Sequence, residues 1–323
     1  MERRCMSTAK TVIFRFTFYS LWTVLLLYSA WRFRPEEARL FTESWNLWRE
    51  PILAGMLCGL LSAWLGVYIL LNRIVFISLG IAQGASFGIF LSFLIAAGLG
   101  IALHESPVSL MFGFMVALGS AFLFAWLRRA RRIPDESLIG FLYVAASGLT
   151  LLIADRVAEG HHNIDDLLFG NAVAVTAFDL KVIATVTGLL FAVHFFFRRE
   201  FLYASADPEF MQIQGLSPRF WNILLYFTLT LGITFNLKTL GSLPVFALMV
   251  IPPLISLKAG RGLREAFLVS LFLGLLLPPL GYFFSYIFSL PTGASVIGVG
   301  CLYLLASLLE GPLTRRLFRR RPS

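Results

Sequence analysis

Ten apolar runs separated by short polar segments fill most of this 323-residue sequence and restrict what it can fold into. They lie at about Thr11–Trp31, Pro51–Leu71, Ile74–Leu103, Val108–Trp126, Leu138–Ala154, Phe178–Phe197, Phe220–Phe235, Leu240–Leu257, Ala266–Phe288 and Ala294–Leu309. Most are close to the roughly 20 residues that a helix needs to cross a bilayer. With 58% hydrophobic and 14% charged residues, the sequence predicts an all-α integral membrane protein of about ten transmembrane helices.

The basic residues predict how these helices are oriented. If residues 1–10 are cytoplasmic, alternate loops should be basic, and these loops contain Arg73, Arg128–Arg132, Arg198–Arg199, Lys258–Arg264 and the tail from Arg315. Lys and Arg collect in cytoplasmic loops, so both termini are expected in the cytoplasm. We therefore expect one transmembrane domain over residues 11–310 and a basic cytoplasmic tail over 311–323. The basic cytoplasmic loops explain the net charge of +9 better than nucleic-acid binding would.

The first apolar run is less regular than the others. Arg15 lies inside it, and we expect this side chain to extend toward the cytoplasm. The connection from Arg32 to Glu50 carries four arginines on the expected outer side, balanced by glutamates. Whether the first run is a full span is therefore left open.

The motifs of common enzyme classes are missing from the sequence. There is no Gly-x-x-x-x-Gly-Lys-Ser/Thr phosphate loop, no His-Glu-x-x-His pair and no Gly-x-Ser-x-Gly turn. Most spans also lack an ionisable residue, which argues against a proton-driven carrier. We expect a chain that is not an enzyme and holds no permanently bound cofactor. A membrane-embedded enzyme or a membrane anchor for a signalling partner is the alternative from another functional class.

A polar segment from Arg198 to Trp221, here called the elbow, interrupts the apolar sequence. Asp207 is a favoured helix N-cap, Pro208 suits the first helical position, and Glu209 complements the helix dipole. Gly215 is suited to end that helix, and Pro218 to begin the next one. This pattern predicts a helix-Gly-helix turn that a soluble partner could bind. An ordinary solvated loop is the alternative.

Six motifs, in order, resemble a known family. They are Leu53-Ala-Gly-Met-Leu-Cys-Gly-Leu-Leu-Ser62 with Leu65-Gly-Val-Tyr-Ile-Leu-Leu-Asn-Arg73, Asp135-Glu-Ser-Leu-Ile-Gly140, Leu168-Phe-Gly170, Asp207-Pro-Glu-Phe with Gly215-Leu, Leu240-Gly-Ser-Leu-Pro-Val-Phe-Ala-Leu-Met-Val-Ile-Pro252 and Leu290-Pro-Thr-Gly293. In these motifs the chain resembles the permease subunits of ABC transporters for zinc, manganese and iron, which are similar to cobalamin and siderophore permeases.

The resemblance implies a type II ABC importer permease that works by alternating access in a bacterial cytoplasmic (inner) membrane. It further implies a homodimer surrounded by membrane lipid, a separate ATPase subunit and an extracytoplasmic metal-binding protein. The coupling loop would be residues 198–219, and its contact residues would be Asp207, Pro208, Glu209, Gln212, Gly215 and Leu216. The transported cargo would be a divalent zinc, manganese or iron ion. The alternative is a metal chelate or another small cargo on the same fold.

The expected translocation path departs from the family pattern. Members commonly carry Asp and His where this sequence has Leu79 and Gln83, and a carboxamide is a poor replacement for an imidazole ligand. Gln83 and Ser86 remain candidate path residues, because small residues around them leave room for a path. Close helix packing explains the same small residues equally well.

A second pair of candidate path residues, Asn236 and Ser242, lies between two apolar runs. Together with Lys238 they break the apolar pattern, and the nearby Pro252–Pro253 pair would free backbone carbonyls. A broken helix at this depth is expected only where it faces protein or water. A simple proline kink without a functional role is the competing interpretation.

A histidine and aspartate cluster precedes Leu168-Phe-Gly170. If this segment is helical, His161 shares a face with Asp165, and His162 shares a face with Asp166. Imidazole and carboxylate groups together suit zinc or manganese, so these four residues are candidate metal ligands. A solvated cap at the end of a span is the alternative.

Overall fold

The computed structural model of the chain describes residues 2–99, 107–128, 134–156, 168–170, 175–259 and 262–318. The regular elements in this part of the chain are all helices. They are α1 (Glu2–Phe33), α2 (Pro35–Glu43), α3 (Trp45–Leu71), α4 (Ile77–Gly98), α5 (Pro107–Leu127), α6 (Asp135–Ala154), α8 (Ala177–Phe196), α9 (Arg198–Ala206), α10 (Pro208–Ile213), α11 (Pro218–Leu240), α12 (Ser242–Ala259), α13 (Leu263–Phe288) and α14 (Thr292–Phe318).

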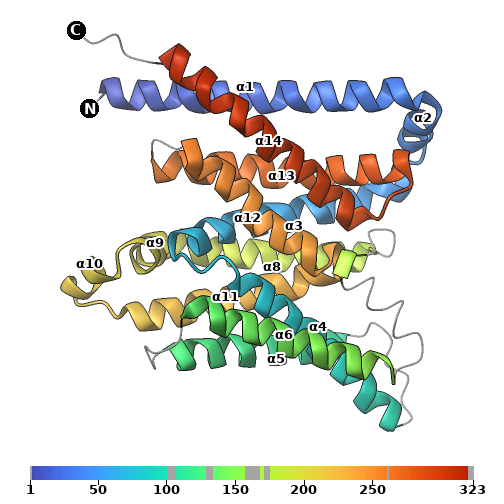
Figure 1. Cartoon of the computed structure of the whole chain (residues 1–323), viewed down its shortest axis with the longest axis vertical. Coiled ribbons are helices and arrows are strands. Elements are labelled where there is room, and N and C mark those ends of the chain that lie inside the picture. The colour runs from blue at the N-terminus through green and yellow to red at the C-terminus, as the bar shows by residue number, and fades with distance from the viewer. Residues whose placement is uncertain are drawn as a thin grey trace.

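The long helices confirm the membrane fold. Over the described residues, nine helices are long and apolar enough to cross a membrane, and a shorter apolar helix covers Ser242–Lys258. Each of the ten runs expected from the sequence corresponds to one of these ten helices. The helices lie side by side across the long axis of the molecule, with α1 at one edge and α5 and α6 at the other (Figure 1).

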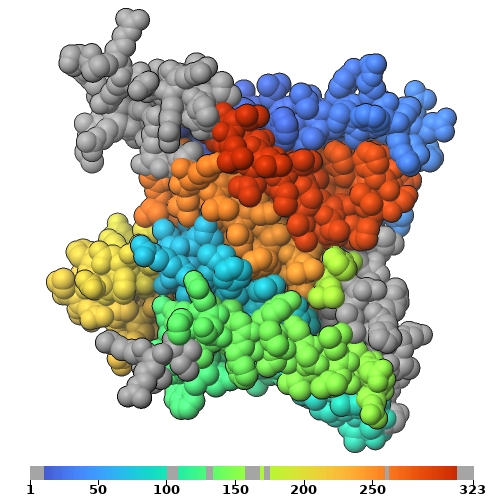
Figure 2. All heavy atoms as spheres, viewed as in Figure 1, coloured from blue at the N-terminus to red at the C-terminus, as the bar shows by residue number. Residues whose placement is uncertain are grey.

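One end of the bundle carries the two short helices α9 and α10. The start of α1, the end of α5, the start of α6 and the end of α14 lie at this same end (Figure 1). In the space-filling view, α9 and α10 project beyond the long helices as a separate lobe (Figure 2). The sequence analysis expects residues 1–10, the α5–α6 connection, the elbow and the C-terminal tail on the cytoplasmic side. The helix ends next to these segments all lie at this end of the bundle.

Helix α3 occupies the centre of the bundle and contacts α8, α11, α12 and α13. A Cβ atom on Gly59 would overlap the carbonyl oxygen of Gly274 in α13, and one on Gly66 would overlap that of Met249 in α12. Glycine at these two positions of α3 is therefore required for its close approach to α12 and α13.

Prolines explain why those two carbonyls are available. An intrahelical partner for the Gly274 carbonyl would be the N–H of residue 278, and a partner for the Met249 carbonyl would be the N–H of residue 253. Both positions are proline, which has no N–H. The helices continue through these prolines, and the two carbonyls lie against glycine backbone in α3. The Met249 carbonyl, which Pro253 leaves without an intrahelical N–H donor, thus faces protein.

The boundary of α11 differs from the sequence expectation. The apolar run ends at about Phe235, but α11 continues through Asn236 and Lys238 and ends at Leu240. Gly241, with a φ of +82°, caps it. The polar residues do not break the helix because they have partners. Asn236 donates from Nδ2 to the Cys58 carbonyl at 3.2 Å, and Lys238 forms a 3.1 Å ion pair with Asp179.

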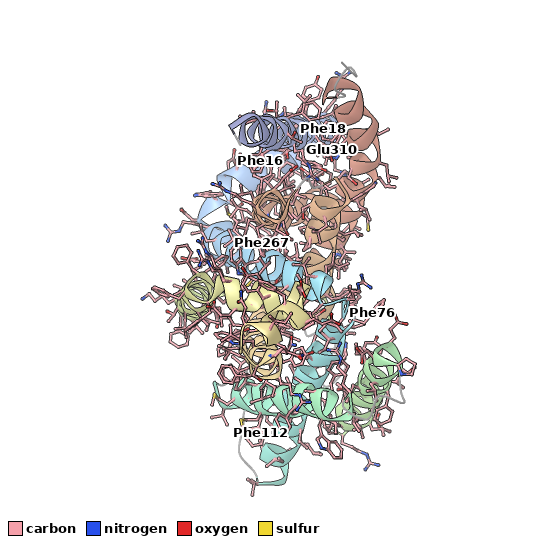
Figure 3. The ribbon with its side chains drawn as sticks, turned by 90° about the vertical axis from the view of Figure 1, so that its left-hand side faces the viewer. Phe16, Phe18, Phe76, Phe112, Phe267 and Glu310 are labelled. Carbon is pink, nitrogen blue, oxygen red and sulfur yellow. The ribbon has the colours of Figure 1, made fainter. Side chains whose placement is uncertain are left out.

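Arg15 does not extend toward solvent as the sequence analysis expects, because it is fully buried. Its guanidinium forms 3.2 Å ion pairs with Glu265 at the start of α13 and with Glu310 in α14. It also donates to the Ile255 and Ser256 carbonyls near the end of α12. In the side-chain view, Glu310 lies toward α1 (Figure 3), and its Oε2 atom accepts a 3.1 Å hydrogen bond from the Tyr19 hydroxyl of that helix. The first apolar run is thus attached to the bundle by buried charge.

We predict that Arg15→Leu destabilises the protein strongly. The substitution leaves the Glu265 and Glu310 carboxylates buried without their cation, which typically costs about 3–5 kcal/mol. The measurement is the melting temperature of the purified protein in detergent. Replacing all three charged residues by leucine should recover most of the loss, because no uncompensated charge then remains.

The control for this prediction is Arg49→Leu, which removes an exposed ion pair to Glu50. Exposed pairs contribute at most about 1 kcal/mol, so its melting temperature should stay near that of the native protein. Equal melting temperatures for Arg15→Leu and Arg49→Leu would contradict a structural role for the buried ion pairs.

Candidate functional site

The elbow has the local structure that its sequence predicts. The Asp207 Oδ1 atom accepts a 3.0 Å hydrogen bond from the Phe210 N–H and so caps α10, and Pro208 is the first residue of that helix. Gly215 has a φ of +76°, which favours glycine, and α11 begins at Pro218. The predicted helix-Gly-helix turn is confirmed.

Buried aromatic rings attach the elbow to the bundle. Phe201 of α9 is fully buried and stacks on His194 of α8, with ring centroids 4.2 Å apart and an interplanar angle of 11°. Tyr68 of α3 packs against both rings. His194 is also hydrogen-bonded through Nε2 to the Thr228 hydroxyl of α11 at 3.0 Å. The elbow therefore contacts three long helices through one cluster.

Asn72, which follows α3, adds a polar link at the same place. Its Nδ2 atom donates to the Ser205 hydroxyl of α9 at 3.2 Å and to the Asn222 side-chain oxygen of α11 at 3.3 Å. The backbone then turns sharply, because Arg73 adopts a φ of +58°. The central helix α3 is thus directly connected to the elbow.

The outer face of the elbow carries exposed apolar and polar side chains. Ile213 is 83% exposed, and Phe210 and Leu216 are also exposed. Glu209 and Gln212 are exposed on the same short helix, whereas Met211 is fully buried against the bundle. An apolar patch on a projecting, well-anchored turn is typical of a protein-binding surface.

The candidate path residues do not all lie together. Gln83 of α4 is almost fully buried, and its Nε2 atom lies 3.5 Å from the hydroxyl of Ser242 at the start of α12. Ser86 is also buried and donates to the Ala82 carbonyl within its own helix. Asn236 instead bonds to the Cys58 carbonyl and the Ser62 hydroxyl of α3. The structure brings Gln83 and Ser242 together and directs the Asn236 amide to α3.

The small residues of α4 serve close packing. A Cβ atom on Gly84 would lie 2.8 Å from the Ser120 hydroxyl of α5, and one on Gly88 would lie 2.6 Å from the Phe112 carbonyl. These glycines therefore face α5 and allow the two helices to approach closely. Gln83 points instead toward Ser242 of α12. Close packing therefore explains the small residues facing α5, and path-lining by Gln83 stays a prediction.

Three of the sequence motifs meet in space beside Ser242. A Cβ atom on Gly241 would overlap the backbone nitrogen of Gly170, and one on Gly293 would overlap the carbonyl oxygen of Phe169. Gly170 and Gly241 both have positive φ angles. This glycine junction, formed by Gly170, Gly241 and Gly293, joins the segment before α8 to the starts of α12 and α14.

An ion pair stabilises the same end of the bundle. Thr176 and Asp179 form a capping box at the start of α8, with a 3.2 Å bond from the Asp179 N–H to the Thr176 hydroxyl. Asp179 also pairs with Lys238 near the end of α11. No sequence pattern indicated this pair, because its members are far apart in the chain.

The predicted metal ligands His161, His162, Asp165 and Asp166 lie outside the described residues. Within the described ranges, no group of three or more His, Cys, Asp or Glu side chains is arranged to hold a metal ion. The metal-ligand prediction for the four residues therefore stays a prediction.

Most of the chain is similar to proteins that are already known. The family model described as "ABC 3 transport family" matches residues 44–310. The manganese transport system membrane protein MntC of Listeria innocua is 24% identical, over 84% of this chain and 94% of that protein. The high-affinity zinc uptake system membrane protein ZnuB of Buchnera aphidicola is 24% identical, over 79% of this chain and 95% of that protein.

A solved structure has the same fold. A chain in the structure of PsaBC from Streptococcus pneumoniae in complex with Fab aligns with a TM-score of 0.74 at 19% identity, covering 86% of this chain and 98% of that chain. The family match begins at residue 44, so α1 and α2 precede the matched region.

We predict that Gly241→Ala destabilises the glycine junction. The φ of +82° and ψ of 166° are accessible essentially to glycine alone, and the added methyl group would overlap the backbone of Gly170. We expect a loss of about 2 kcal/mol or more, measured as a lower melting temperature. The control is Gly148→Ala in α6, where the new methyl group would meet no atom within 4 Å. Equal melting temperatures for the two variants would contradict the close approach.

Proposed function

The chain belongs to the ABC 3 transport family, and from this membership we propose that it is the membrane permease of an ATP-driven importer for a divalent transition metal. The observation that carries the proposal is the family match over residues 44–310, which includes every helix from α3 to α13. Manganese, zinc and iron are the proposed cargoes. The permease itself is not an enzyme in this proposal, and hydrolysis of ATP is assigned to a partner chain.

The elbow is the proposed docking surface for the ATPase. The exposed side chains of Phe210, Ile213 and Leu216 offer an apolar contact, and Glu209 adds a charge beside it. The buried stack of Phe201 on His194 supports this role, because a well-anchored turn transmits a push to the helices behind it. Asp207, Pro208, Gln212 and Gly215 shape and complete the surface.

The proposed path runs beside Gln83, Ser86 and Ser242. Gln83 and Ser242 are polar groups buried between α4 and α12, and the glycine junction next to Ser242 leaves its backbone tightly constrained. Movement of the elbow would shift α3, α8 and α11 together, and alternating access would follow from that shift at the junction. We assign Asn236 to the wall of the path, where its amide secures α11 to α3.

The proposed assembly places two permeases about a twofold axis, with two ATPases and one extracytoplasmic metal-binding protein. Many apolar residues of α6 are exposed, including Phe141, Val144 and Leu152, and are available to a second copy. The proposed location is the bacterial cytoplasmic membrane, with both termini inside. The cluster at His161, His162, Asp165 and Asp166 is the proposed first metal contact at the outer end.

One observation favours a different cargo on the same fold. The sequence carries Leu79 and Gln83 where the family commonly has Asp and His, so two strong metal ligands are missing. A metal chelate, whose cation is already coordinated, would not need them. This second candidate shares the ATPase, the elbow and the path.

The test is uptake by the complete complex, with its ATPase and binding protein, in sealed vesicles. We expect ATP-dependent uptake of free manganese, zinc or iron that stops when ATP is omitted. Uptake of a metal only when a chelator is added would favour the second candidate. ATP-independent uptake, or failure to associate with any ATPase, would contradict the proposed function.

We predict that Glu209→Lys uncouples the complex. Reversing an exposed charge inside the proposed docking surface should lower the affinity for the ATPase about tenfold or more, and uptake should fall accordingly. The melting temperature should be unchanged, because Glu209 is exposed. The measurement is co-purification of the ATPase together with uptake.

The matched control is Lys258→Glu, which reverses one exposed charge near the end of α12, outside the elbow. It should retain ATPase binding and uptake. If Glu209→Lys also retained both, the elbow would not be the docking surface.

We further predict that Gln83→Met lowers uptake about tenfold, the effect of losing about 1.4 kcal/mol of contact with the cargo. Methionine has nearly the volume of glutamine but cannot offer its amide, so packing is preserved. Uptake and melting temperature are measured together. Normal uptake with a lower melting temperature would show that Gln83 serves packing instead of the path.

A further inference from the structure

A groove on the side of the bundle has no role in the function above, and one of its ends lies at the same end of the bundle as the elbow. It lies between α5 and α11 and has a volume of about 460 Å³. Its walls include Met115, Gly119 and Phe122 of α5 and Ile223 and Phe227 of α11. This volume falls in the range of about 300–1,000 Å³ that is typical of small-molecule sites.

The groove is apolar and faces outward. Among its lining residues only Tyr226 carries a polar side-chain atom, and Met115 and Phe122 at its rim are each 62% exposed. Gly119 contributes to its depth, because this wall residue has no side chain and the space where a Cβ atom would lie is open, with no atom within 4 Å. Both walls are membrane-spanning helices, so the medium that reaches the groove is the hydrocarbon of the bilayer.

A cationic side chain lies at one end of this groove. Arg128 follows α5 and donates from Nη1 to the Tyr226 hydroxyl at 3.0 Å. Its guanidinium also lies over the Phe124 ring at 6.0 Å and forms a 2.9 Å ion pair with Asp135. Its side chain is still 36% exposed. The one polar atom of the groove wall is thus used to position an arginine at its mouth.

Further positive charge lies near the same end. Arg219 is exposed in the first turn of α11 and lies four residues before Ile223, on the same face of that helix. Asp135 pairs with Arg128, whose side chain remains partly exposed, and Arg219 adds a second exposed positive charge.

We propose that this groove binds an anionic phospholipid, with one acyl chain between α5 and α11 and the phosphate group at Arg128 and Arg219. An apolar slot inside the membrane suits an acyl chain, and arginines at the end of a span suit a phosphate. The proposal adds a lipid site to the protein and does not depend on which cargo is transported.

A second copy of the chain fits the groove less well. Two copies in one membrane are related by a twofold axis along the membrane normal, so each groove would face the same groove at the same depth. That arrangement would bring Arg128 and Arg219 of both copies toward each other. Like charges close together oppose such a contact, whereas a phosphate neutralises them.

The test is native mass spectrometry of the purified complex, incubated with phosphatidylglycerol or phosphatidylcholine carrying the same acyl chains. Each arginine near a phosphate contributes about fivefold in affinity, so we expect the native complex to retain at least about fivefold more phosphatidylglycerol. Arg128→Gln should remove most of this preference. Gly119→Leu should lower retention of both lipids, because the side chain fills open space in the groove.

Two matched controls separate this site from general effects. Gly188→Leu adds the same side chain on α8 at a position that also has no atom within 4 Å, and Arg264→Gln removes an exposed charge at the start of α13, outside the elbow. Both should bind lipid as the native complex does. Equal retention of the two lipids by the native complex, or equal retention by Gly119→Leu and Gly188→Leu, would overturn the proposal. So would a disulfide between two copies of Phe122→Cys, which would indicate that a second copy fills the groove.

Discussion

The contact of two backbone carbonyls with the glycine face of α3 determines how the centre of this bundle is arranged. In a bilayer, burying one apolar helix against another gains little over contact with lipid, so close van der Waals packing has to bring helices together. Gly59 and Gly66 permit that packing. Pro278 and Pro253 leave the carbonyls four residues before them, those of Gly274 and Met249, without an intrahelical N–H donor. Contacts of such carbonyls with Cα–H groups are weakly favourable. The positions of α12 and α13 relative to α3 follow from these four residues.

The elbow and the proposed path are both linked by side-chain contacts to the central helix α3. At one end, Asn72 links α3 to the elbow, and Tyr68 packs on the aromatic cluster that anchors it. Toward the other side, Cys58 and Ser62 accept the hydrogen bonds of Asn236 in α11. A displacement of the elbow therefore reaches α3 and α11 directly. The glycine junction adjoins the end of α11, so it would respond to the same displacement.

The sequence predicted the elements that depend on local pattern and missed those that depend on distant partners. Hydropathy located the long helices, and the capping residues located the elbow, since both signals lie within a few neighbouring positions. The end of α11 was wrong because Asn236 and Lys238 find partners on α3 and α8, which no local pattern reveals. Arg15 was misplaced for the same reason. On α4, the residue types indicated both close packing by glycines and a candidate path residue, Gln83. Only the structure shows that the glycines face α5 whereas Gln83 faces α12.

The ion pairs of Arg15 also bear on how the protein is made. Arg15 is synthesised before its partner Glu265, which lies 250 residues later in the chain. At about 5–20 residues per second, the arginine waits on the order of tens of seconds for its first carboxylate. During that interval α1 must be held by the insertion machinery, by lipid phosphates or by the water interface near its end. Helices α13 and α14, which are synthesised after α1, would then secure α1 in the bundle.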